Sequence, residues 1–152
     1  MPYTNADARQ QLLDALGEAT EDLGSAVAAL GEAYEQLDEQ TGDVLEAQLF
    51  RPVQHAYGRA QRTYAAFAER HDLNAAELAL ATPGAPSRGP RGFIDDGVDA
   101  ARRADEELAT LQDSLLPVEV GDPELRSGLE EIRTLLGHVP GRARELVRTL
   151  GR

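Results

Sequence analysis

The most regular feature of the chain is a leucine that recurs at every seventh position near the amino end. Apolar residues at such helical spacings lie on one face of an α-helix, whereas a half-buried strand alternates every second residue. The pattern predicts a helix over residues 6–40, which would span about 52 Å. The row consists of Leu16, Leu23, Leu30 and Leu37, and the neighbouring row of Leu12, Ala19, Ala26 and Ala33.

A second apolar row follows a break at residues 41–43. Gly42 is typical of a helix C-terminus and Asp43 of the N-cap of the next helix. The row predicts a helix over residues 43–71, which Pro52 can kink because proline removes a backbone donor and crowds the preceding turn. Its members are Phe50, Val53, Tyr57, Ala60, Tyr64 and Phe67.

Residues 82–92 form the clearest linker, because six of these eleven residues are Pro or Gly. Such a segment either joins neighbouring helices or carries the chain across a bundle. Just before it, Asn74 and Glu77 have the spacing of a capping box, which would begin a short additional helix.

Two further apolar rows predict a helix over residues 93–116, ended by Pro117, and another that begins at Asp122. Asp122 is a good N-cap, and it is followed by Pro123 at the first helical position and by an acid in the first turn. The last row keeps its phase across Pro140, which favours one helix kinked there. In the rival interpretation a short fifth helix begins at Pro140.

These elements predict an all-α fold, a four-helix bundle built from two antiparallel helical hairpins. The length of 152 residues matches one domain, so residues 1–152 are expected to form a single helical domain. No segment of useful length alternates with a period of two, and we therefore expect almost no strand.

Charge alternates from one predicted helix to the next. Residues 1–50 carry one Arg and eleven acidic residues, and residues 92–124 carry two Arg and ten. Residues 51–91 and 125–152 each carry six Arg and three acidic residues. We expect antiparallel neighbours to meet with opposite sign, and we interpret the alternation as selecting which helix lies beside which.

Composition removes several classes of function. The net charge of −12 opposes binding to nucleic acid and to anionic lipid, both of which need a surplus of basic residues. The lack of cysteine excludes disulfides, thiol nucleophiles and thiolate metal sites. We see no signal peptide and no apolar run of about 18 residues, and therefore expect a cytoplasmic protein without a membrane partner.

The sequence shows no catalytic or metal-binding constellation. A ferritin-like di-iron site needs Glu-x-x-His on two helices, and no acidic residue lies three positions before or after His55, His71 or His138. The serines lie outside any nucleophile elbow, and the adjacent pair Glu106 and Glu107 points about 100° apart on a helix. We predict a protein that is not an enzyme and holds neither cofactor nor metal.

Two sets of residues on the second helix are candidates for a ligand site. Arg51, His55, Arg59 and Arg62 share one helix face, where arginines can hold a phosphate or carboxylate by paired hydrogen bonds. Tyr57 and Tyr64 belong to an aromatic stripe that could line a pocket for a planar ligand. We favour the simpler alternatives, in which the basic ridge faces the acidic first or third helix and the stripe is core.

Gly17, Gly24 and Gly31 lie seven apart on one edge of the first helix. Each costs about 1 kcal/mol of helix propensity relative to alanine, so the row indicates that another helix approaches closely there. The sequence leaves open whether that helix belongs to the same chain or to a second copy.

The leucine heptad and the glycine row predict a helical-bundle protein that acts through protein–protein contact. We expect its partner to be a second copy of the chain or another helical protein. The alternative function is a bundle that binds an anionic or aromatic small molecule through the Arg51–Arg62 ridge and the two tyrosines.

Overall fold

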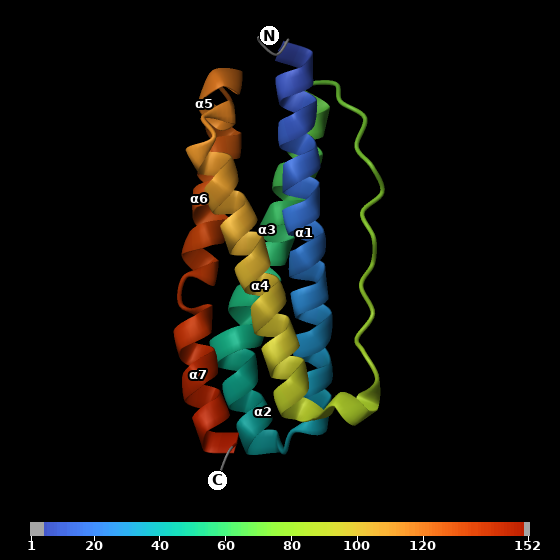
Figure 1. Ribbon diagram of the computed structural model, residues 1–152, viewed down its shortest axis with the longest axis vertical. Helices are drawn as coiled ribbons and strands as arrows, with labels where there is room; N and C mark the ends of the chain where they lie inside the picture. The colour runs from blue at the N-terminus through green and yellow to red at the C-terminus, as the bar shows by residue number, and fades with distance from the viewer. Residues whose placement is uncertain (1–4, 151–152) are drawn as a thin grey trace.

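The computed structural model describes residues 5–150, which form an all-α fold without strands over that range (Figure 1). The long helices are α1 (Asn5–Gln36), α3 (Arg51–Arg70) and α4 (Gly89–Asp113). Shorter elements are α2 (Glu39–Leu45), the π-helical η1 (Glu46–Phe50), the 3₁₀ turn η2 (Pro86–Arg88), α5 (Leu116–Val120), α6 (Pro123–Leu136) and α7 (Val139–Leu150).

The helices that pack most extensively against α1 run in the opposite direction to it. In Figure 1, α1, α6 and α7 run down the page, whereas α3 and α4 run up it. Helix α1 packs on both α3 and α4, α6 packs on α3, and α4 also contacts α6 and α7. Because α3 and α4 run in the same direction, the chain between them has to return along the length of the molecule. It does so on the outer side of α1.

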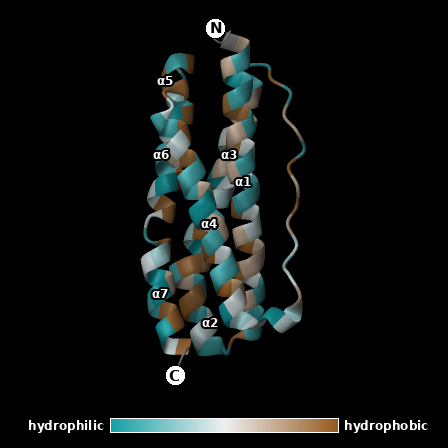
Figure 2. Cartoon of the chain, viewed as in Figure 1, coloured by the Kyte–Doolittle hydropathy of each residue, from teal (hydrophilic) through white to brown (hydrophobic). Residues whose placement is uncertain are grey.

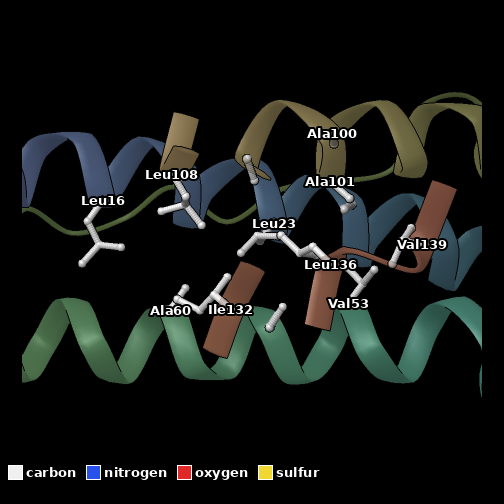
Figure 3. Packing of buried hydrophobic residues seen from close by; sticks show 14 of the residues in the cluster. Leu16, Leu23, Val53, Ala60, Ala100, Ala101, Leu108, Ile132, Leu136 and Val139 are labelled. Carbon is white, nitrogen blue, oxygen red and sulfur yellow. The ribbon is translucent and has the colours of Figure 1, made fainter. Parts of the chain in front are cut away.

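The core is made by the apolar faces that the sequence pattern predicts. Figure 2 shows hydrophobic residues interspersed with hydrophilic ones along the helices. In Figure 3, Leu16 and Leu23 of α1 lie among side chains from α3, α4 and α6, and the first three leucines of the heptad are fully buried. Burial of one leucine side chain contributes about 1.5–3 kcal/mol to the stability of the fold, so the leucine face of α1 stabilises the packing of all the helices around it.

The first helix boundary lies earlier than predicted. The chain turns at Leu37 and Asp38, not at residues 41–43, and Gly42 lies inside α2. A Cβ atom on Gly42 would lie 3.4 Å from the ring of Tyr34. The glycine is therefore used for close contact between α1 and α2 rather than to end a helix.

At Pro52 the backbone changes its hydrogen-bonding pattern without ending the helix. The π-helical turn η1 lies immediately before α3, and Pro52 occupies the first turn of α3. A π-helical turn widens the spiral, which is one way for a continuous helix to accept a residue that lacks an amide donor.

The irregular segment is longer than the predicted linker and begins earlier. No helix forms at residues 74–77, and residues 89–92 belong to α4 rather than to the linker. Side chains of α1 and α3 bind the backbone of this segment. The Tyr64 hydroxyl accepts from the Ala76 amide at 3.0 Å, the Glu21 carboxylate accepts from the Ala79 amide at 2.7 Å, and Gln36 donates to the Pro86 carbonyl at 3.2 Å.

The last part of the chain contains one more break than we favoured. Asp122 caps α6 as predicted, since its carboxylate accepts a hydrogen bond from the Leu125 amide at 2.9 Å. The favoured single helix across Pro140 is wrong, because α6 ends at Leu136 and α7 begins at Val139. This agrees with the rival interpretation: Pro140 lies in the first turn of α7, where its missing amide donor costs nothing.

A close contact between α1 and α4 depends on a glycine. A Cβ atom on Gly97 of α4 would lie 2.7 Å from Cγ of the fully buried Leu30 and 3.3 Å from the Ala26 carbonyl oxygen. The branch point of a buried leucine cannot rotate away, so α4 can approach α1 this closely only without a side chain at position 97.

We predict that Gly97→Ala lowers the free energy of unfolding by about 1–3 kcal/mol, because overpacking of a filled core outweighs the gain in helix propensity. Gly31→Ala is the matched control. Its Cβ atom would lie 3.7 Å from the Phe50 ring, an ordinary contact, so this variant should gain about 0.5–1 kcal/mol. Urea unfolding followed by far-UV circular dichroism measures both. Equal effects of the two substitutions would contradict this account of the α1–α4 contact.

Candidate functional site

The most extensive helix contact joins two helices of like charge, whereas the next joins a basic helix to a slightly acidic one. The first is between the acidic helices α1 and α4. The second joins α3, with four Arg and one acidic residue, to α6, with two Arg and three acidic residues. Our interpretation that alternating charge selects the neighbours is therefore wrong for the α1–α4 interface. Burial of apolar side chains decides the arrangement, and a few local ion pairs accommodate the charge.

Between α1 and α4 the like charges meet around Glu107. Burial raises the pKa of Glu107 to about 8, helped by a hydrogen bond to Asp22 and by the nearby charge of Glu18. Arg103 partly offsets the crowding, with its Nε 3.8 Å from an Asp22 oxygen. At neutral pH, Glu107 is therefore largely protonated, which lets three carboxyl groups share this interface.

Between α3 and α6 the arginines are matched by acids of the opposite helix. Arg59 donates to Glu131 at 2.6 Å, and Arg70 donates to Glu124 at 2.8 Å. The two helices also approach closely at Gly128, where a Cβ atom would lie 2.6 Å from the Thr63 hydroxyl. Individual acids near or within a basic segment thus supply the pairing that the net charge of the segment does not.

Asp122 is the most deeply buried charged residue among those described, with an exposed fraction of 5%. Its carboxylate accepts hydrogen bonds from the Arg70 guanidinium, at 2.8 and 3.0 Å, and lies 2.8 Å from Nε2 of His71. Burial opposes its ionisation, but the hydrogen bonds from Leu125, Arg70 and His71 outweigh it, so the pKa of Asp122 is lowered. This cluster joins the end of α3 to the start of α6.

Sequence reasoning identified Asp122 as a helix cap but missed its ion pair. Arg70 and His71 are adjacent at the end of α3, and basic residues are common near a helix C-terminus. Their contact with Asp122 joins residues 52 and 51 positions apart. No local spacing links them, so the only signal available in the sequence was the presence of basic residues at one helix end and of an acid at another.

The basic ridge on α3 does not converge on a site. Arg51 pairs with Glu46 of the preceding turn at 3.7 Å, and Arg59 with Glu131 of α6. His55 and Arg62 are exposed. The favoured alternative, a ridge that faces the acidic first or third predicted helix, is wrong for Arg59, because its partner Glu131 lies on α6, in the fourth.

The two tyrosines lie against the predicted glycine row. A Cβ atom on Gly17 would lie 3.1 Å from the Tyr64 ring, and one on Gly24 would lie 3.3 Å from Tyr57. Gly31 lies opposite Phe50, but at the ordinary contact distance of 3.7 Å. The three glycines, seven residues apart on α1, thus lie against three aromatic residues that are also seven apart on η1 and α3. The order is reversed because α1 and α3 are antiparallel. The close approach occurs within one chain, so the row is accounted for without a second copy.

Among residues 5–150, no three His, Asp or Glu side chains are placed to bind a metal ion together. Within the same range, no helix is both long enough and apolar enough to cross a bilayer.

A broad groove between α4 and α7 has a mixed apolar and charged lining. Its volume is about 810 Å³. The half-buried side chains of Val98 and Val147 form its apolar floor together with Pro140 and Ala143. The charged lining comes from both helices and from η2: Arg88, Asp95, Asp99, Arg102, Arg144 and Arg148.

A second groove lies on the other side of α7, facing α2 and η1. It has a volume of about 440 Å³, and its lining includes Val44, Gln48, Arg142 and Leu146. Helix α7 therefore carries an open groove along each flank.

No protein-family model, curated protein or solved structure matches this chain. Its function has to be inferred from its own residues.

We predict that Asp122→Ala lowers the free energy of unfolding by about 2–4 kcal/mol, because it leaves Arg70 without its buried partner and removes a helix cap. Glu124→Ala, which removes the exposed partner of Arg70, should cost less than about 0.5 kcal/mol. The contribution of Asp122 is present above its unfolded pKa and is lost as pH falls through the lowered folded value. Urea unfolding at neutral pH and at acid pH measures both effects; equal losses for the two variants would contradict them.

We predict the opposite pH dependence for Glu107. Its folded pKa is raised from the ordinary value of 4.5 to about 8, so the folded protein binds the proton more tightly and stability falls as pH rises through this range. Glu107→Gln should stabilise the protein by about 1 kcal/mol at the upper end of that range, after allowance for solvent screening. The neighbouring Glu106→Gln, on an exposed residue, is the control. Thermal unfolding across this pH range should show a flatter profile for Glu107→Gln alone.

Proposed function

We propose that this protein is a non-enzymatic interaction protein that self-associates through the surface formed by α4 and α7. The observation that carries the proposal is the groove of about 810 Å³ between these helices, which combines an apolar floor with an arginine-rich lining. Interfaces typically have such an apolar centre and polar rim, and arginine is enriched in them.

The composition of the groove supports a protein partner over a small ligand. A small-molecule site usually encloses its ligand on most sides and presents a few converging polar groups. This groove instead runs between two helices, and its charged side chains come from both of them. An extended surface of this kind suits a helix or a corner of another protein.

The packing of the helices supports the finer architecture that the sequence predicts. We infer a four-helix bundle in which α6 and α7 together supply the fourth rod and α5 covers one end. The supporting observations are the pairwise contacts of α1, α3, α4 and the α6–α7 pair, and the single long crossover, a connection known among such bundles.

The alternative, a bundle that binds an anionic or aromatic small molecule, has no observation in its favour. Tyr64 is buried and its hydroxyl bonds the Ala76 backbone, while Tyr57 packs over Gly24. Neither tyrosine lines any of five surface grooves along residues 5–150. The alternative and the cytoplasmic location stay predictions from sequence.

We predict that the purified protein shows a mass above that of one chain that increases with concentration over about 1–100 µM, as expected for a specific interface of modest size. Sedimentation equilibrium measures this, and native mass spectrometry gives the number of subunits together with any bound mass. A strict monomer over the whole range would contradict self-association. A bound small molecule would support the alternative function, a bundle that binds a small ligand.

A further inference from the structure

We propose that two copies of the chain associate reciprocally, with an acidic corner of each copy seated in the α4–α7 groove of the other. This inference rests on the proposed self-association and names the two surfaces that meet. We define the acidic corner as the last turn of α1, the turn at residues 37–38 and α2. Its acidic residues are Glu35, Asp38, Glu39 and Asp43.

The groove lining keeps one positive charge after its own ion pairs are formed, because two arginines remain against one carboxylate left unpaired among the described residues, that of Asp95. Arg88 pairs with Asp96 at 2.7 Å, and Arg102 pairs with Asp99 at 2.6 Å. Arg144 and Arg148 are exposed, and neither forms an ion pair with another residue of the range 5–150. Both line the same groove as the apolar floor residues of α7. A partner that brings carboxylates to this side of the groove would form ion pairs with both arginines.

The acidic corner has the complementary composition. Its four carboxylates are exposed and form no ion pair among the residues that the structure describes. Asp38 precedes α2, yet its side chain does not cap that helix, so its carboxylate stays available. No arginine lies between Arg9 and Arg51, so nothing on this stretch of chain offsets the charge.

The same corner carries the apolar side chains that a partner groove needs. Tyr34 is 38% exposed and Val44 is 46% exposed, although most large apolar residues of the described range are buried. The Tyr34 ring lies against Gly42, so the end of α1 and α2 form one continuous surface. An exposed aromatic flanked by carboxylates matches a shallow apolar floor flanked by arginines.

The positions of the two surfaces favour a reciprocal arrangement. The end of α1, α2, the first half of α4 and α7 all lie in the lower part of the molecule in Figure 1. Because both surfaces lie at one end, a single two-fold axis at that end can bring each corner to the other groove. A two-fold arrangement is the commonest in homodimers, and it forms both contacts at once.

The net charge of the chain opposes association of two copies. Two chains of −12 repel each other overall, so association requires local attraction between the corner and the groove. Salt screens both effects, but the local pairs act over the shorter distance. Local attraction and general repulsion can be distinguished by reversing charges at the two surfaces and, in a control, making the same change in net charge elsewhere on the protein.

Three double variants test the pairing. The groove variant is Arg144→Glu with Arg148→Glu, and the corner variant is Glu35→Arg with Asp43→Arg. The control variant, Arg62→Glu with Arg126→Glu, makes the same change in net charge as the groove variant. Both of its arginines are exposed and lie outside the groove and the corner. Circular dichroism checks the fold of each variant, and sedimentation equilibrium measures its association at about 0.15 M salt, where charges are screened over about 8 Å.

We expect the wild type and the control variant to associate, and the groove and corner variants each to weaken association at least about tenfold. An equimolar mixture of groove and corner variants should recover a dimer. In the mixed dimer the groove that now carries glutamates meets the corner that now carries arginines, and the other contact joins an unaltered groove to an unaltered corner. Three outcomes overturn the proposal: association of the groove variant as tight as that of the control, no recovery on mixing, or recovery by the control in place of the corner variant. In these cases self-association itself still stands, whereas a monomeric wild type removes the proposed function as well.

Discussion

The close packing of α1 against its neighbours is the constraint on which the rest of the structure depends. Alanines and leucines of α1 meet α4 at a distance that only Gly97 permits, and the glycine row of α1 meets the aromatic residues of η1 and α3. These contacts place α3 and α4 on two sides of one helix. Since both run opposite to α1, the chain between them must travel the length of the molecule, which explains the long extended segment.

Charge follows this packing rather than directing it. Close packing of α1 with α4 brings Glu18, Asp22 and Glu107 together, and Glu107 stays largely protonated near neutral pH because its pKa is raised. Close packing of α3 with α6 brings the arginines of α3 against acids of α6, such as Glu131. Burial contributes on the order of 1.5–3 kcal/mol per leucine side chain, whereas an exposed ion pair contributes about 0–1 kcal/mol. Apolar burial therefore decides which helices meet.

The surfaces left over by that packing are the basis of the proposed function. Helix α7 is short, and it is separated from α6 by a break at residues 137–138. Both of its flanks remain open as grooves, and two of its arginines are exposed without an ion pair within residues 5–150. The acidic corner, in the same part of the molecule, has carboxylates that are likewise exposed and without an ion pair within residues 5–150. The proposed function and the proposed pairing both follow from these unmatched groups.

The sequence by itself determined the helical class, the apolar face of each helix and the cap at Asp122, because these depend on residues within a few turns of one another. It also located the glycine row, whose cost in helix propensity required compensation. Only the tertiary structure decided that Tyr57 and Tyr64 provide that compensation at two of the three glycines. It also decided that Gly42 packs instead of ending a helix, and that Arg70 and His71 reach Asp122. These outcomes depend on which faces meet across distant segments, and a single chain pattern is compatible with several such pairings. Core packing selects among them through close contacts that no local spacing encodes.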